Sequence, residues 1–181
     1  MEDRLLVLRC KRGGVAAMAR IYRKYRKDLL VLALALLNDK AAAEDIVQDV
    51  FVGFAEGIRS FRLTGSLRAY LMTCVANRAR NHNKAKRPHE ALRPDRSSDG
   101  SLASGPVERL ACNEQLRRLA EALDQLPYEQ RETLMLHMYG GLSLRAVART
   151  RGLSANTVMS RYRYGIDRLR GLLNGECDHE V

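Results

Sequence analysis

The sequence predicts an all-α fold made of two small helical domains joined by a flexible linker. Three observations support this fold class. Apolar residues recur at three- and four-residue steps in both halves of the chain, as expected for helices with one buried face. No run alternates polar and apolar residues for long enough to indicate a sheet. A stretch rich in proline, glycine and serine separates the two helical parts.

The separating stretch runs from Pro88 to Pro106 and contains three of the four prolines in the chain but few apolar residues. A long surface loop within a single domain is the alternative. Structureless loops of this length are uncommon inside compact domains, however. We therefore expect a first domain at 1–87, a linker at 88–107 and a second domain at 108–181.

The first domain contains a predicted helix that begins near Ala41. Its buried stripe comprises Ile46, Val47, Val50, Phe51, Phe54 and Ile58. Its opposite face is mainly acidic and comprises Asp45, Gln48, Asp49 and Glu56. A further helix, with Ser66 as its N-cap, buries Leu67, Leu71, Cys74 and Val75. The exposed face of that helix is basic, with Arg68, Arg78, Arg80 and Lys84.

The second domain begins with an apolar stripe that ends at Leu126-Pro127. Pro127 suits the first turn of the next helix, which we expect to run to about Tyr139 and to stop at Gly140-Gly141. Ser143 then caps a short helix, Leu144 to Arg151, and Gly152 supplies the left-handed residue that commonly ends a helix. Ser154 caps a last helix that reaches about Leu173. The tract from Ser143 onward therefore has the order helix, tight turn, longer helix that defines a helix-turn-helix.

The helix-turn-helix tract has the charge expected of a DNA-binding element. Between 145 and 170 it contains seven arginines and one acid, Asp167, and phosphates should bind there. The last helix projects hydrogen-bonding side chains that suit a major groove, namely Asn156, Thr157, Ser160, Arg161 and Arg163. An ordinary helical bundle with a solvated basic face is the alternative. Gly165 costs about 1 kcal/mol in mid-helix relative to alanine, so it either bends the helix or permits a close contact.

Composition favours a polyanionic partner and argues against secretion, a membrane span and a metal site. The net charge is +10, which makes nucleic acid the leading candidate. The N-terminus carries Glu2 and Asp3 where a signal peptide would be basic. The apolar run Leu29–Leu37 has nine residues, whereas a membrane-spanning helix needs about 20. The four cysteines form no CxxC pair, and Cys177 with His179 is only half a metal site. We expect a cytoplasmic protein without a metal or a cofactor.

Several segments, in this order, resemble a known family. Residues 43–51 (AEDIVQDVF), Phe61-Arg62, 66–71 (SLRAYL) and 75–77 (VAN) resemble region two of the extracytoplasmic-function sigma factors. Residues 126–131 (LPYEQR), 141–143 (GLS) and 157–161 (TVMSR) are similar to region four of the same family. The resemblance covers nearly all of the chain outside the linker, and its specificity lies in the ordered set rather than in any single motif.

The resemblance implies roles for three groups of residues. The acidic helix would dock on the clamp helices of RNA polymerase through Asp45, Gln48 and Asp49, and the carboxylates of the two aspartates would pair with arginines. The minus-ten promoter element would be opened by Phe61, Ser66, Tyr70, Asn77, Arg78 and Asn81, although Phe61 and Tyr70 are also readable as plain core aromatics. The minus-thirty-five element would be read by Ser154, Asn156, Thr157, Ser160, Arg161 and Arg163. The resemblance also implies an anti-sigma partner.

Departures from the family pattern limit what can be transferred. Tyr70 and Phe54 stand where the family usually has tryptophan, and Asn81 replaces a common aspartate. Arg145-Ala146 stands where an acid is usual, and Arg163-Tyr164 shifts the basic pattern by one position. The promoter sequence is therefore not carried over from any relative.

Two other functions compete with that of a sigma factor. An autonomous helix-turn-helix regulator would usually dimerise on paired half-sites, and the sequence shows no dedicated dimer helix. A metal-dependent nuclease or phosphotransferase would use Glu44, Asp45 and Asp49, but no nucleophile with a base is recognisable. We expect the chain not to be an enzyme.

Overall fold

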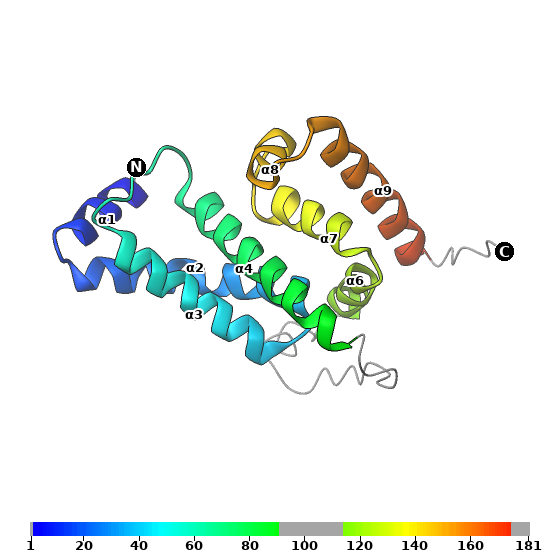
Figure 1. The fold of residues 1–181 in the computed structure, drawn as a ribbon, viewed down its shortest axis with the longest axis horizontal. Coiled ribbons are helices and arrows are strands. Elements are labelled where there is room, and N and C mark those ends of the chain that lie inside the picture. The colour runs from blue at the N-terminus through cyan, green and yellow to red at the C-terminus, as the bar shows by residue number, and fades with distance from the viewer. Residues whose placement is uncertain (1, 91–113, 175–181) are drawn as a thin grey trace. The chain divides into compact units, whose positions relative to one another are not determined.

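The computed structural model describes residues 2–90 and 114–174, and every regular element in these two ranges is helical. The helices are α1 (Glu2–Lys11), α2 (Val15–Leu37), α3 (Lys40–Gly57), α4 (Leu67–Glu90), α6 (Glu114–Asp124), α7 (Tyr128–Leu134), the π-helical turn η1 (Met135–Tyr139), α8 (Leu144–Arg151) and α9 (Ala155–Asn174) (Figure 1). The all-α prediction is confirmed for this part of the chain. The chain divides into two compact units, with the boundary between Ala79 and Arg80.

Short turns with favourable residues join the helices of the first unit. Gly13, in the left-handed region with φ of +83°, lies in the turn between α1 and α2, which pack on each other. Asn38 adopts a left-handed conformation with φ of 54° and ends α2. Asp39 follows at once as the N-cap of α3 and accepts a hydrogen bond from the backbone N–H of Ala42 at 3.1 Å. Two adjacent residues therefore stop one helix and start the next, which brings α3 back along α2.

The core of the first unit is apolar and contains the long apolar run of the sequence. Within α2, Leu29, Leu32 and Leu36 are fully buried, so the predicted assignment of 29–37 to the core is confirmed. The buried stripes of α3 and α4 comprise Ile46, Val47, Val50, Phe51, Phe54, Leu67, Leu71 and Val75, as predicted. Cys74 is only partly buried. None of the described helices is both long and apolar enough to cross a membrane.

The second unit has the predicted helix-turn-helix with its predicted caps. Ser143 Oγ accepts from the N–H of Ala146 at 3.2 Å, and Ser154 Oγ accepts from the N–H of Thr157 at 3.0 Å. Gly152 has φ of +62° and ends α8. The helices α7, α8 and α6 all pack on α9, which therefore forms the spine of this unit.

Two local features of the second unit differ from a simple helical expectation. Pro127 is the N-cap of α7 rather than a residue of its first turn. The segment expected to be one α-helix to Tyr139 changes to a π-helical turn at Met135, where the N–H of Gly140 bonds to the carbonyl of Met135 at 2.8 Å. The wider turn accompanies a hydrogen bond between His137 Nδ1 and the carbonyl of Leu142 at 2.6 Å. The His137 ring also stands edge-on to Tyr162 of α9, with ring centroids 5.0 Å apart.

Gly165 permits a close contact between helices. A Cβ atom there would lie 3.1 Å from Leu134 Cδ1 and 3.3 Å from Gln130 Cβ, both on α7. Glycine is therefore explained as the residue that lets α9 approach α7.

The predicted linker and tail lie mainly outside the described residues. The helix α4 continues to Glu90 and so includes the first three residues of the predicted linker. Residues 91–107 fall outside the described ranges, as does the tail with Cys177 and His179.

Candidate functional site

The acidic face of α3 is held in place by the core behind it. Ile46, Val47 and Val50 are buried, and Asp45, Gln48 and Asp49 point to the opposite, exposed side of the same helix. Because residues three and four apart share a helix face, these three polar side chains form one contiguous surface. The three residues expected to bind polymerase are thus brought together on the surface of the first unit.

The acidic face of α3 meets the basic face of α4 at one ion pair. Arg78 Nη1 lies 3.6 Å from Asp49 Oδ2, and Arg78 Nη2 donates to the backbone carbonyl of Asp49 at 3.3 Å. A Cβ atom on Gly53 would lie 3.2 Å from Arg78 Nη2, so the glycine leaves room for the arginine. Both side chains of the pair are about half exposed, and such pairs are worth only about 0–1 kcal/mol. Asp49 and Arg78 can therefore separate and bind external partners at little cost in free energy.

Three aromatic rings form a cluster where α3 ends and α4 begins. Phe61 lies 4.7 Å from Tyr70 and 5.2 Å from Phe54, measured between ring centroids. Phe54 is buried, Phe61 is half-buried and Tyr70 is 40% exposed. The cluster therefore runs from the core to the surface. For Phe61 and Tyr70, the two residues expected either to bind a base or to be core aromatics, the structure shows an intermediate position: Phe61 is half-buried against Phe54, and Tyr70 has a ring that is both packed and accessible.

Burial keeps the polar groups of this cluster neutral. It raises the pKa of the Tyr70 phenol, and the neighbouring Cys74, which shares a hydrogen bond with it, raises that pKa further. Burial also raises the pKa of the Cys74 thiol, against smaller opposite effects of Tyr70 and Arg78. At neutral pH the Tyr70 hydroxyl is a neutral donor and acceptor, and Cys74 is not a reactive thiolate.

The remaining candidates for minus-ten recognition lie along α4. Ser66 is exposed and caps the helix, because its Oγ accepts from the N–H of Ala69 at 3.3 Å. Tyr70, Asn77 and Asn81 follow it at helical spacing, so all four positions share one stripe. Asn77, Arg78 and Asn81 are exposed. The structure thus places the polar candidates on one side of α4, with the aromatic cluster at its N-terminal end.

The recognition helix α9 exposes most, but not all, of the residues expected to read DNA. Asn156, Ser160 and Arg163 recur at steps of four and three and form the centre of its exposed face. Ser154 and Thr157 are also exposed, but their hydroxyl groups bond to each other at 2.8 Å. Arg161 is half-buried and lies toward the side of the helix that packs on the unit.

Two exposed residues of α9 were not selected from the sequence. Met159 is 53% exposed and Tyr164 is 56% exposed, and both flank the exposed face of the helix. The guanidinium carbon of Arg163 lies 5.2 Å from the centre of the Tyr164 ring. Their helical spacing from Val158, the buried residue of this turn, was the signal that could have identified them.

Glu44, Asp45 and Asp49, the carboxylates considered for a metal site, do not gather into one. Across residues 2–90 and 114–174, no group of three or more histidine, cysteine, aspartate or glutamate side chains is arranged to hold a metal ion.

The fold defines a class of protein: a helical protein of two compact units whose second unit contains a helix-turn-helix, the arrangement of many DNA-binding proteins. Comparison with known families narrows the class. Residues 21–88 match the Sigma-70 region 2 family and residues 116–169 match the Sigma-70, region 4 family. The chain belongs to the sigma-70 family of RNA polymerase sigma factors, in the extracytoplasmic-function group. Promoter-specific initiation of transcription is the function supported by this membership, and an autonomous regulator is not favoured.

Relatives match over most of their length. The ECF RNA polymerase sigma factor EcfG of Rhodopseudomonas palustris is 30% identical over 146 residues, which cover 81% of this chain and 79% of the relative. The ECF RNA polymerase sigma factor SigK of Mycobacterium ulcerans is 30% identical over 173 residues, which cover 93% and 90%.

Solved structures are similar as well. The sigma factor RpoE of Bartonella quintana, solved with the anti-sigma factor NepR, is 27% identical with a TM-score of 0.71, covering 88% of this chain and 98% of that one. CnrH, solved with the cytosolic domain of CnrY, has a TM-score of 0.68 at 22% identity and covers 98% and 100%, which shows the shared fold.

Proposed function

We propose that the predicted first domain, residues 1–87, holds RNA polymerase and promoter DNA at the same time, on two adjacent faces. The α3 face with Asp45, Gln48 and Asp49 docks on the polymerase clamp. The α4 face opens the minus-ten element through Phe61, Ser66, Tyr70, Asn77, Arg78 and Asn81. The observation that carries this proposal is the Asp49–Arg78 contact, where the acidic and basic faces meet. Because this ion pair is weak, Asp49 can bind polymerase and Arg78 can bind DNA without unfolding the domain.

Opening of the minus-ten element requires a surface that receives an unstacked base. Flipping a base costs a few kcal/mol, and stacking on an aromatic ring returns about 1–3 kcal/mol per base. Tyr70 is suited to this role because its ring is partly exposed yet supported by Phe61 and Phe54. Asn77 and Asn81, on the same side of α4, supply hydrogen bonds to base edges.

Recognition of the minus-thirty-five element falls to α9. Asn156, Ser160 and Arg163 present donors at the centre of its exposed face, with Ser154, Thr157 and Arg161 around them. The linker is the proposed tether: its 17 residues beyond the end of α4, 91–107, could span at most roughly 60 Å, against about 34–36 Å for one turn of DNA. This reach lets domains 1–87 and 108–181 occupy both elements together.

The protein acts in the cytoplasm as a binding factor rather than an enzyme, and an anti-sigma protein controls it. Support for such a partner comes from the Bartonella quintana relative, whose structure contains an anti-sigma factor. An anti-sigma protein that covered the α3 face would prevent docking on polymerase.

The experiment that tests this proposal is run-off transcription by purified core polymerase on a library of promoter fragments. The wild-type chain should confer specific start sites. Asp45→Arg combined with Asp49→Arg should weaken core binding more than tenfold, because it replaces two carboxylates on the docking face by cations. Glu121→Arg, at an exposed acid of α6 that is not part of this face, is the control and should bind within about twofold of wild type. Unchanged binding of the double variant would overturn the docking assignment.

Arg161→Ala separates DNA recognition from polymerase binding. It should weaken binding to the minus-thirty-five element and lower the slope of log affinity against log salt by about one, while core binding stays unchanged. Because Arg161 is half-buried, a thermal melt must show that the domain remains folded. An equal loss of core binding would show that α9 is not primarily a DNA-reading helix.

A further inference from the structure

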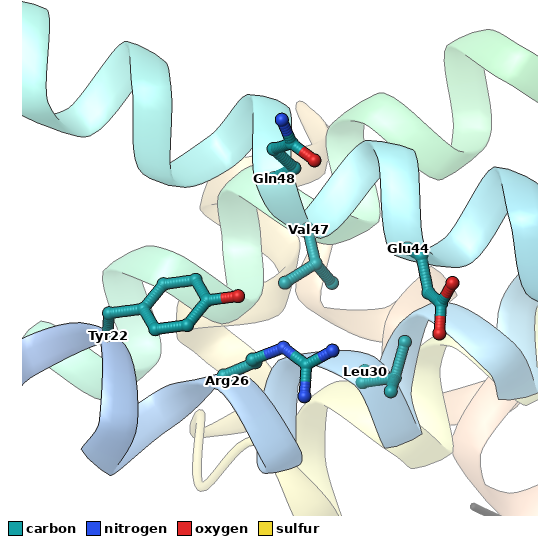
Figure 2. Close-up of a pocket in the computed structure, with 6 residues that line it drawn as sticks. All are labelled: Tyr22, Arg26, Leu30, Glu44, Val47 and Gln48. Carbon is teal, nitrogen blue, oxygen red and sulfur yellow. The ribbon is translucent and has the colours of Figure 1, made fainter.

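A pocket of about 140 Å³ lies between α2 and α3, next to the docking face (Figure 2). Its apolar lining is Leu30 and Val47, both buried in the core. Tyr22 and Arg26 from α2, together with Glu44 and Gln48 from α3, complete the lining. Small-molecule sites usually measure about 300–1,000 Å³. This pocket therefore has the size for a side chain of a protein partner rather than for a free metabolite.

The cation of this pocket is held in position but has no anionic partner. The Arg26 guanidinium carbon lies 6.0 Å from the centre of the Tyr22 ring, and the Tyr22 ring lies 4.7 Å from that of Phe51 on α3. Within the described residues, Arg26 makes this cation–π contact and no ion pair. Two other cations of α2 are neutralised, since Arg20 bonds to Glu2 at 2.7 Å and Lys24 bonds to Glu2 and Asp3, whereas Arg26, like Arg23 one turn before it, makes no ion pair within the described residues. Arg26 is thus an exposed charge that the fold supports but does not neutralise.

We propose that this pocket is an anchor site for one acidic side chain of the polymerase surface that docks on α3. Arg26 binds its carboxylate, and the Gln48 amide donates a second hydrogen bond. Continuity supports this occupant, because Gln48 lines the pocket and also belongs to the proposed docking face. Charge complementarity at Arg26 supports an acid, because Arg26 makes no ion pair within the described residues; Glu44, which lines the same pocket, is the second charge there. This inference rests on the proposed docking of α3 on polymerase.

With this pocket, the docking surface carries negative charge on α3 and positive charge on α2. This charge pattern favours one orientation of the partner. Asp45 and Asp49 require cations from the partner, whereas Arg26 requires an anion on the α2 side. In Figure 2, Glu44 stands on the other side of Arg26 from Tyr22, where it can take a further cation of the partner. A partner helix that bound in the reverse direction would place like charges opposite each other. Such arrangements select partner and register more than they raise affinity.

The test compares charge reversals on α2 in the full-length chain, with equilibrium binding to purified core polymerase as the readout. Arg26→Glu should weaken binding at least tenfold, and Arg26→Gln should weaken it by a smaller factor because it adds no repulsion. Arg26→Lys should fall between wild type and Arg26→Gln, since lysine keeps the charge but not the planar fork. Lys27→Glu is the matched control: it makes the same charge change at an exposed residue that does not line the pocket, and it should bind within about twofold of wild type.

Failure of this inference can be distinguished from failure of the proposed function. If wild type binds core and the Asp45→Arg, Asp49→Arg variant does not, docking by α3 stands. Wild-type affinity of Arg26→Glu, or equal weakening by Arg26→Glu and Lys27→Glu, would then overturn the anchor pocket alone. If wild type itself fails to bind core, the docking function is wrong and the inference is overturned with it. Thermal melts of each variant confirm that only folded protein is compared.

Discussion

The two units of this sigma factor differ in whether they bury an ion pair. In the first unit, the described ion pairs lie at or near the surface, as with Lys24–Asp3 at 2.7 Å and Arg68–Asp28 at 3.0 Å. The second unit buries a charge, because Glu132 is 1% exposed and lies 2.9 Å from Arg151 of α8. Surface pairs contribute little to stability, whereas half of a buried pair cannot be lost cheaply. The first unit therefore keeps its charges available for partners, whereas the second, which also has exposed pairs, uses Glu132 with Arg151 and Arg80 to hold its own parts together.

The difference follows from the size of the elements. The helices α2, α3 and α4 have 23, 18 and 24 residues, and they share a large apolar core. By contrast, α7 and α8 have 7 and 8 residues, and α8 buries only Val147 and Ala148. Short helices that bury little apolar surface need other stabilising interactions. These interactions are the helix caps, the close approach of α9 to α7 at Gly165 and the Glu132–Arg151 ion pair. Together they orient α9.

Removal of the buried cation should give the largest effect on stability. Arg151→Met keeps much of the side-chain volume but removes one of the two arginines that pair with the buried Glu132 carboxylate. Because Arg80 still pairs with Glu132, the loss should cost about 2 kcal/mol. Hydrogen exchange on the full-length chain should show loss of protection in α7, α8 and α9, with α2 and α3 unchanged. Arg149→Met, at an exposed position of the same helix, is the control and should be nearly neutral. Equal, small effects of the two variants would mean that the pair does not stabilise the second unit.

Changes to Ser154, the N-cap of the recognition helix α9, should have a smaller effect on stability. Two substitutions of this residue separate its contribution to stability from its contribution to DNA binding. Ser154→Ala removes the hydrogen bond to the N–H of Thr157 and should cost about 1 kcal/mol. Ser154→Asp should retain the cap, since aspartate is a good N-cap residue, but it places an anion where DNA phosphates should bind. We therefore expect Ser154→Ala to lower thermal stability and Ser154→Asp to lower mainly DNA affinity. Normal DNA affinity of a folded Ser154→Asp variant would argue against phosphate contact at this position.

The surface cluster of the first unit should give the smallest effect, with a defined pH dependence. Burial raises the pKa of Asp3, but hydrogen bonds from Lys24 and Tyr25 outweigh it, so the net pKa is lowered. A lowered carboxyl pKa contributes stability above the ordinary value of about 4, and this is lost as the pH falls through the folded value. Asp3→Asn should therefore cost roughly 0.5 kcal/mol at pH 7. The difference from wild type in chemical denaturation should shrink below about pH 4, and a difference that grew there would contradict the assignment.

Local chemistry made part of the fold predictable. The caps Ser66, Ser143 and Ser154 bond to an N–H group three residues away, so the sequence around each contains everything that forms it. The left-handed Gly152 is equally local. The π-helical turn at Met135 was not foreseen, because it accompanies contacts of His137 with Leu142 and with Tyr162 of another helix. The roles of Asp45, Gln48 and Asp49 came from family resemblance and remain predictions.

By itself the sequence determined which residues share a helix face, where most helices begin and end, and that one face of α3 is acidic while α4 and α9 are basic. Helical periodicity and cap chemistry act over three or four residues, so they can be read along the chain. Only the tertiary structure decided which faces meet: Asp49 with Arg78, Glu132 with Arg151, and Arg26 beside Gln48. These pairings depend on how helices pack, and many combinations of the same faces would satisfy the sequence pattern equally well.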